Sequence, residues 1–221
     1  MVKSSTAYRL DEPELAPQTS QLQFGGGEPP NPPLNANLPV ISNERLAVMM
    51  FLGAEAMFFA GLIGAFLVFR LGSAVWPPPF QPRLPVGVTG FNTLILLASA
   101  FTMRAGLKAI GCGETKRLIR ILGMTAALGG IFLAIQGYEW IRLIHFGLTV
   151  SSSVYGGLFY TLIGFHAVHV LGALIWLAVV LVKARRGHFT TSSHTGLLTC
   201  GMYWTFVVGL WPVLYALVYL Y

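Results

Sequence analysis

The stretch MMFLGAEAMFFAGLIGAF, residues 49–66, lies at the centre of an apolar run from Leu46 to Phe69. Glu55 is the only charged residue in that run. A carboxylate this deep in a bilayer costs on the order of 3 kcal/mol or more unless it is protonated, hydrated or paired. The run therefore predicts a membrane-spanning helix, and Glu55 is interpreted as a functional or assembly site with a polar partner.

The composition of the whole chain indicates a membrane protein. Hydrophobic residues make up 55% of the sequence, charged residues make up 10%, and the mean hydropathy is +0.68. An apolar run of about 20 residues crosses the hydrocarbon core as a helix. None of the runs alternates with period two, so a membrane barrel is not expected. The predicted fold is all-α, a polytopic membrane protein with a bundle of five transmembrane helices at Leu46–Leu71, Val86–Leu107, Leu118–Ile144, Val154–Val182 and Leu197–Tyr221.

The first 42 residues differ in composition from the rest of the chain. They hold seven of the thirteen prolines and a run of three glycines, Gly25 to Gly27. Such a segment buries too little apolar surface to fold alone, so residues 1–42 are predicted to form a disordered cytoplasmic tail. Residues 43–221 are predicted to form the transmembrane domain. No apolar segment follows the first basic residues, so the first spanning helix is expected to act as its own insertion signal.

The distribution of Lys and Arg predicts the orientation in the membrane. If the five predicted helices alternate in direction, eleven of the fourteen Lys and Arg residues lie on the side of the N-terminus and three lie on the opposite side. The N-terminus is therefore expected in the cytoplasm (or matrix) and the C-terminus in the periplasm. The net charge of +6 reflects this loop bias, and no nucleic-acid partner is expected.

The fourth predicted helix carries a second polar centre, His166 and His169, three residues apart on one face. His169 lies roughly 20 Å from the inner end of its helix, and Glu55 roughly 14 Å from the inner end of its own. This difference of about one helical turn is within reach of two long side chains. We expect Glu55 to pair with His169, with His166 as the second choice. The alternative is that hydroxyl groups or water satisfy each side chain separately.

Basic residues near the membrane surface are candidates for lipid binding. Lys183, Arg185 and Arg186 form a cluster in the last predicted inner loop, and Arg70 can extend to the headgroups on the other side. Each such charge attracts anionic lipid by about 1 kcal/mol. The simpler interpretation is that these residues only set the topology, and both can hold.

No redox centre is predicted in this chain. A six-coordinate haem b needs two histidines on different helices, whereas His166 and His169 share one helix. A copper site needs Cys, His and Met ligands close together, and the sequence offers no such cluster. Cys112 and Cys200 are both expected on the reducing side, where a structural disulfide is not expected.

Six segments of the sequence point to a known family: FLGAEAMFFAGLIGAF, WPPP, FNTLILLASA, GYEW, GLTVSSSVYGGLFYTLIGFHAVHVLGALIW and ARRGHF. They resemble subunit III of the haem-copper oxidases, the cytochrome c oxidase subunit III family. The resemblance covers about 175 residues from Arg45 onward, and it implies five helices equivalent to the last five of seven-helix members, as in short bacterial forms. It also implies a chain without metal or haem in the bacterial inner membrane. Its partners would be the catalytic subunit I and the copper-bearing subunit II, which hold the haems and copper. It would stabilise the catalytic subunit, support proton uptake and bind phospholipid in a cleft.

The resemblance assigns roles to individual residues. Glu55 matches the family's buried, carbodiimide-reactive glutamate, and His166 and His169 match its paired histidines. Glu139 matches an acid that the family carries at the outer end of the helix equivalent to the third predicted helix of this chain. The sequence departs from the family in the last helix, where Thr205 and Val208 replace a usual His and Asp. The contacts made by those two polar residues are therefore expected to be lost or moved.

These observations favour a non-catalytic subunit of a proton-pumping terminal oxidase, which passes electrons from cytochrome c or quinol to oxygen. A subunit III-like partner of a quinol oxidase or of a nitric oxide reductase remains an alternative. An independent proton-coupled transporter could use Glu55, His166 and His169 as a relay. No inverted repeat or paired helix interruption supports the transporter. The histidine placement disfavours a cytochrome-b-like electron carrier.

Overall fold

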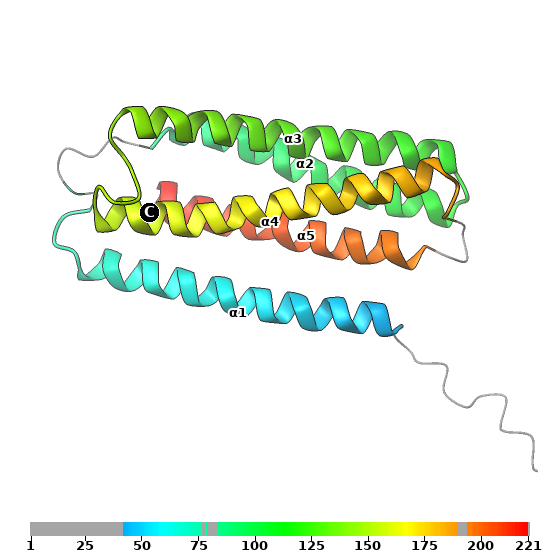
Figure 1. The fold of residues 1–221 in the computed structure, drawn as a ribbon, viewed down its shortest axis with the longest axis horizontal. Helices are drawn as coiled ribbons and strands as arrows, with labels where there is room; N and C mark the ends of the chain where they lie inside the picture. The colour runs from blue at the N-terminus through cyan, green and yellow to red at the C-terminus, as the bar shows by residue number, and fades with distance from the viewer. Residues whose placement is uncertain (1–41, 77, 79–83, 190–193, 221) are drawn as a thin grey trace, which may run out of the picture. The chain divides into compact units, whose positions relative to one another are not determined.

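The computed structural model describes residues 42–76, 78, 84–189 and 194–220, and within these ranges its regular structure is entirely helical. The structure contains five long α-helices in these ranges (Figure 1). They are α1 (Asn43–Gly72), α2 (Val86–Gly111), α3 (Thr115–His145), α4 (Val154–Arg185) and α5 (Thr195–Tyr215), and a short π-helix, η1 (Ala216–Leu220), follows α5. The predicted tail lies, except for its last residue, outside the described residues.

All five predicted spans are present. In the described part of the chain, five helices are long and apolar enough to cross a membrane, with α5 and η1 together forming the fifth. The predicted boundaries were too short where charged residues follow an apolar run: α2 extends beyond Leu107 to Gly111, and α4 extends beyond Val182 to Arg185. Hydropathy marks the edge of the hydrocarbon core, whereas backbone hydrogen bonding continues the helix into the headgroup region.

The helices run alternately up and down, so their ends gather in two groups (Figure 1). We call one group the basic end, where α1 and α5 begin and the turn between α2 and α3 lies. The Lys and Arg residues described there are Arg45, Arg104, Lys108, Lys116, Arg117, Arg120, Lys183, Arg185 and Arg186. The opposite group is called the far end, and its described basic residues other than histidine are Arg70 and Arg142.

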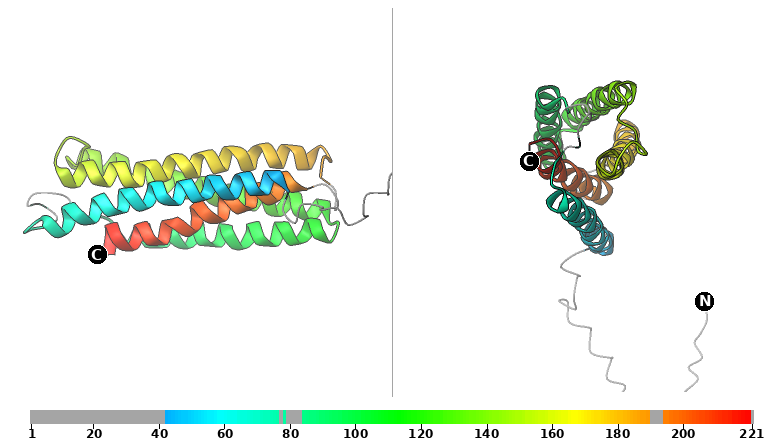
Figure 2. Two further views of the ribbon diagram at one scale, coloured as in Figure 1. Left: turned by 90° about the horizontal axis from the view of Figure 1, so that it is seen from below. Right: turned by 90° about the vertical axis from the view of Figure 1, so that its left-hand side faces the viewer.

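Four helices form the body of the bundle, and α1 lies outside it. The end-on view in Figure 2 shows α2, α3, α4 and α5 arranged around a common centre, with α1 against α5 and α4. The largest side chains in that centre are Trp204 and Trp211 of α5. Only Phe59 and Phe66 of α1 are buried. Most of the α1 surface is therefore available to lipid or to another chain.

Close helix contacts in the body depend on small and polar residues, as is usual in membranes. A Cβ atom at Gly129 of α3 would lie 2.5 Å from Cη2 of Trp204, so only glycine leaves room for this indole. The indole then reaches across the bundle, where Trp204 Nε1 donates to Ser99 Oγ of α2 at 3.1 Å. In the same way, Asn92 Nδ2 donates to the main-chain oxygen of Phe132 at 3.1 Å. These contacts fix α2, α3 and α5 to one another.

Candidate functional site

Glu55 and His169 meet near the middle of the membrane-spanning helices. Glu55 lies about 18 Å along α1, which is about 45 Å long, and His169 lies about 22 Å along α4, which is about 48 Å long. The distance between His169 Nε2 and Glu55 Oε2 is 2.8 Å, and each side chain is 16% exposed. The structure thus brings to Glu55 the histidine that depth along the helices favoured.

The contact made by Nδ1 of His169 shows which ring nitrogen carries a hydrogen when the imidazole is neutral. His169 Nδ1 is 2.6 Å from the main-chain oxygen of Phe165, one turn earlier in α4. A carbonyl oxygen can only accept, so Nδ1 carries a hydrogen. In a neutral imidazole, Nε2 then has a lone pair and would face the carboxylate acceptor without a hydrogen bond, which would leave Glu55 Oε2 without a partner.

The contact becomes a hydrogen bond when one further proton is present. Either Glu55 is protonated and donates to Nε2, or the imidazolium Nε2 donates to the carboxylate. Both forms have zero net charge, and they differ only in the position of one proton along the 2.8 Å contact. A neutral pair avoids the large cost of an isolated charge at this depth. The arrangement can therefore hold one proton between α1 and α4.

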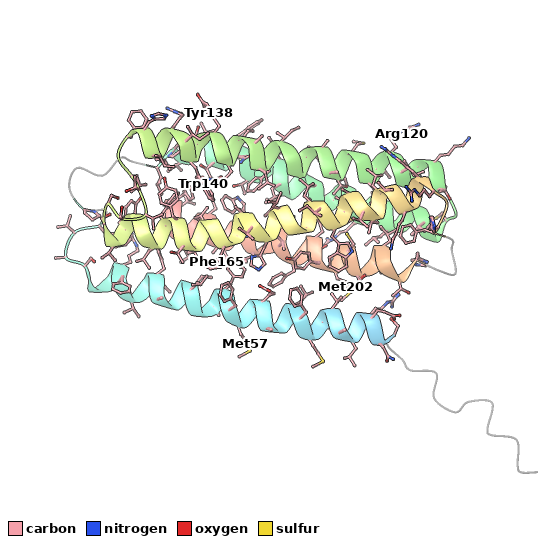
Figure 3. All side chains as sticks on the ribbon, viewed as in Figure 1. Met57, Arg120, Tyr138, Trp140, Phe165 and Met202 are labelled. Atoms are coloured by element: carbon pink, nitrogen blue, oxygen red, sulfur yellow. The ribbon has the colours of Figure 1, made fainter. Side chains whose placement is uncertain are left out.

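Aromatic rings shield this pair. Phe59, which is buried, packs against the His169 ring in a T-shaped arrangement with the centroids 5.1 Å apart. Phe58 and Phe165 pack edge to face at 5.2 Å, and Phe58 also lies 6.3 Å from the His169 ring. Figure 3 shows Phe165 on the side of α4 that faces α1, whereas Met57 points outward from α1. The rings reduce the access of water and strengthen the electrostatic interaction between Glu55 and His169.

His166 occupies a different environment from His169. It is fully buried, and its ring stacks on Trp211 with the centroids 5.0 Å apart and an interplanar angle of 26°. Neither ring nitrogen of His166 has a hydrogen-bond partner among the described residues. The two histidines therefore do not act on Glu55 in the same way: His169 contacts it, and His166 packs into the bundle.

Glu139 belongs to a separate ion pair at the far end. Its Oε1 accepts from Arg142 Nη1 at 3.2 Å, and its side chain is 6% exposed. Nearby, Gln136 Nε2 donates to the hydroxyl of Tyr219 in η1 at 3.2 Å. Glu139 thus has its own partner on its own helix.

The candidate lipid-binding residues lie at the two ends of the bundle. Lys183, Arg185 and Arg186 are exposed at the C-terminal turn of α4, at the basic end. Arg70 lies at the far end, and its guanidinium carbon is 5.7 Å from the centre of the Trp76 ring. The structure does not bring Arg70 together with the other three.

Thr205 and Val208 of α5, where the resemblance led us to expect altered polar contacts, have local or apolar environments. Thr205 Oγ1 donates to the main-chain oxygen of Gly201 in its own helix, and Val208 is buried.

Cys112 is exposed and Cys200 is buried, and both thiols are free. Within the described ranges, no group of three or more His, Cys, Asp or Glu residues could hold a metal ion.

Sequence reasoning missed two contributors to the site. The main-chain oxygen of Phe165 accepts the Nδ1 hydrogen of His169, and Phe59 of α1 covers the Glu55–His169 pair. The first had no clear signal, because bonding to the carbonyl at i−4 of the same helix is typical of Ser and Thr and not of His. The second carried no signal beyond the general abundance of phenylalanine in this sequence.

Comparison with known proteins identifies the fold family. Residues 35–221 match the family model described as cytochrome c oxidase subunit III. Cytochrome c oxidase subunit 3 of Synechocystis sp. is 41% identical over 178 residues, which cover 80% of this chain and 75% of the relative. The subunit 3 of Thermostichus vulcanus is 35% identical over 79% of this chain and 86% of its own length. That of Sus scrofa is 34% identical over 79% of this chain and 68% of its own length.

Proposed function

Because the chain belongs to the cytochrome c oxidase subunit III family, we propose that it is the non-catalytic, membrane-spanning subunit III of a proton-translocating terminal oxidase in aerobic electron transport. The catalytic subunit I and the copper-bearing subunit II are its partners and hold the haems and copper. This chain stabilises subunit I and supports proton uptake. The family match over residues 35–221 carries this proposal. The Glu55–His169 contact supports the proton-uptake role, because it can hold a proton in mid-membrane without a net charge.

Purification of the tagged full-length chain in mild detergent tests this proposal. We expect haem absorbance in the visible spectrum, and mass spectrometry should find a large multi-helix partner with a copper-binding companion. Replacing Glu55 by Gln should leave this composition intact. A colourless chain that is monodisperse by itself would contradict the proposal and favour an independent transporter, for which proton flux in liposomes is the next measurement.

We further propose that the basic end faces the bacterial cytoplasm. The excess of Lys and Arg at that end supports this orientation. Cys112 provides a native reporter, since it is exposed in the turn between α2 and α3 whereas Cys200 is buried. A membrane-impermeant maleimide should label Cys112 in inverted vesicles and not in intact spheroplasts. Labelling of Cys112 only from outside would reverse the orientation, and a Cys112→Ser variant shows the background.

Lipid headgroups are proposed to bind at both ends of the bundle. Lys183, Arg185 and Arg186 present three positive charges at the end of α4, and each attracts an anionic headgroup by about 1 kcal/mol. Arg70 can make the equivalent contact at the far end. Changing Lys183, Arg185 and Arg186 to Gln should reduce the cardiolipin or phosphatidylglycerol retained after purification. Unchanged lipid content would leave these residues with a topological role only.

A further inference from the structure

The two sides of the Glu55–His169 pair are covered by different kinds of side chain. Toward the far end, the covering groups are the three phenyl rings described above, which come after Glu55 in α1 and before His169 in α4. A phenyl ring neither donates nor accepts a proton. His166 lies on the same side, fully buried, and its ring nitrogens have no hydrogen-bond partner among the described residues. Proton exchange through side chains is therefore not favoured toward the far end.

Toward the basic end, three aromatic rings from three helices form a layer. The Tyr203 ring of α5 lies 5.9 Å from the Phe51 ring of α1 and 5.6 Å from the Trp176 ring of α4, measured between centroids. We call these three residues the aromatic layer. Phe51 precedes Glu55 in α1 and Trp176 follows His169 in α4, so the layer lies between the pair and the basic end. Figure 2 shows the first half of α1 against α5 at this end.

Tyr203 is the member of the aromatic layer that can pass a proton on. A relay must accept one proton and donate another, which a phenol can do, whereas an indole N–H only donates. Between the basic end and the pair, residues 46–54 of α1 and 170–182 of α4 carry no hydroxyl, thiol or charged group. The corresponding part of α5 carries Thr195, Thr199 and Tyr203 at a spacing of four, which places them along one face. These hydroxyl groups form a polar line from the basic end to the layer.

Glu55 keeps one carboxyl oxygen for a second contact. Its Oε2 is buried against His169 Nε2, whereas Oε1 and the Tyr203 hydroxyl are not fully buried and hydrogen-bond to none of the described residues. Side chains of a helix lean toward its N-terminus, so Glu55 leans toward the basic end and toward Phe51 of the layer, one turn or about 6 Å along α1. Glu55 also acts electrostatically on the Tyr203 hydroxyl. A phenol so placed can reach the carboxyl group directly or through one water molecule.

We propose that Tyr203 relays protons between the basic end and the Glu55–His169 pair. A hydronium ion on the basic-end side gives a proton to Tyr203 Oη as the phenol's own proton passes to the Glu55 carboxylate. One O–H bond forms and one breaks at Oη, so the phenol is neutral before and after, and the pair gains the proton that makes it neutral. This inference rests on the proposed role in proton uptake and names the residue through which the proton arrives.

Hydrogen–deuterium exchange of the pair tests the relay in the intact complex. The complex is mixed rapidly from H₂O into D₂O, and infrared spectroscopy follows the signal of the pair, which is identified by its loss in Glu55→Gln. Tyr203→Phe keeps the ring in the aromatic layer and removes the hydroxyl. The exchange rate should fall about 100-fold, within the range for a positioned proton-transfer group, while the signal before exchange keeps its position. The matched control is Tyr160→Phe, whose lost hydroxyl donates to the main-chain oxygen of Leu148 at 2.9 Å near the far end, and its exchange rate should equal that of the wild type.

Two further variants separate the relay from packing. A monofluorinated tyrosine at position 203 keeps the hydroxyl and should restore the wild-type exchange rate. Thr199→Val removes the hydroxyl one turn closer to the basic end and should slow exchange, by less than Tyr203→Phe does. The relay would be overturned by wild-type exchange in Tyr203→Phe or in Thr199→Val, by equal slowing in Tyr160→Phe, or by a fluorotyrosine variant as slow as Tyr203→Phe. A wild-type chain that purifies without a haem-bearing partner would instead contradict the proposed function.

Discussion

Replacing His169 by Leu should destabilise the protein much more than replacing Glu55 by Gln. Because the oxygen of Phe165 holds the Nδ1 proton, the lone pair on His169 Nε2 can accept from the amide of Gln at position 55. That variant keeps the contact, and its free energy of unfolding should fall by less than about 1 kcal/mol. His169→Leu leaves Glu55 without this partner near mid-membrane. A charge at the helix centre costs about 2.5–3.5 kcal/mol, and protonation of the carboxyl limits the loss to about 2–3 kcal/mol.

The double variant separates pairing from general damage. If the two side chains act as a pair, Glu55→Gln should cost little or even stabilise the protein in the His169→Leu background, giving a coupling energy on the order of 1–2 kcal/mol. Unfolding of the purified protein in mixed micelles with increasing SDS measures these energies. Carbodiimide labelling of Glu55, which requires a protonated carboxyl, should increase in His169→Leu and change little in His166→Leu. Additive energies, or equal labelling in the two histidine variants, would refute the assigned geometry.

Three further changes test the packing and the second ion pair by thermal unfolding of the purified complex. Gly129→Ala should be destabilising by about 1–3 kcal/mol, because the added Cβ would lie 2.5 Å from the Trp204 indole. The control is Gly123→Ala, whose Cβ meets nothing within 4 Å. This control should be neutral or stabilising by up to about 1 kcal/mol. Asn92→Leu removes a hydrogen bond to the main chain of α3 and should cost about 0.6–1.7 kcal/mol. Arg142→Gln removes the ionic partner of the buried Glu139 and should cost about 1–3 kcal/mol, and a Glu139→Gln change in that variant should recover part of the loss.

The helices could be predicted because their main signal is local. An apolar run of sufficient length has few alternatives to a spanning helix in a bilayer, and five such runs became α1–α5. The depth of Glu55 and His169 followed from counting residues at 1.5 Å each, because both helices are uninterrupted near these positions. Helix ends were less accurate, since charged residues such as Lys183 continue α4 beyond the apolar run.

The different environments of the two histidines could not be derived from spacing alone. Residues three apart in a helix differ by about 60° in direction, so a shared face is only approximate. Here that difference is enough for His169 to face Glu55 of α1 while His166 stacks on Trp211 in the bundle. Which histidine takes which role depends on the rotation of α4 against α1 and α5. That rotation is set by packing across the whole bundle, which no single segment of sequence encodes.

The Glu55–His169 contact lies at the interface where apolar packing is weakest. Phe59 and Phe66 are the only buried residues of α1. In a bilayer, an apolar helix face gains little by exchanging lipid for another helix, so this packing alone does not fix the position of α1 along the bundle. A slip of one turn would separate Glu55 from His169 by about 5.4 Å and leave the carboxyl without its partner. We therefore expect the pair to set the register of α1, so that the contact that can hold a proton also keeps the outermost helix in place.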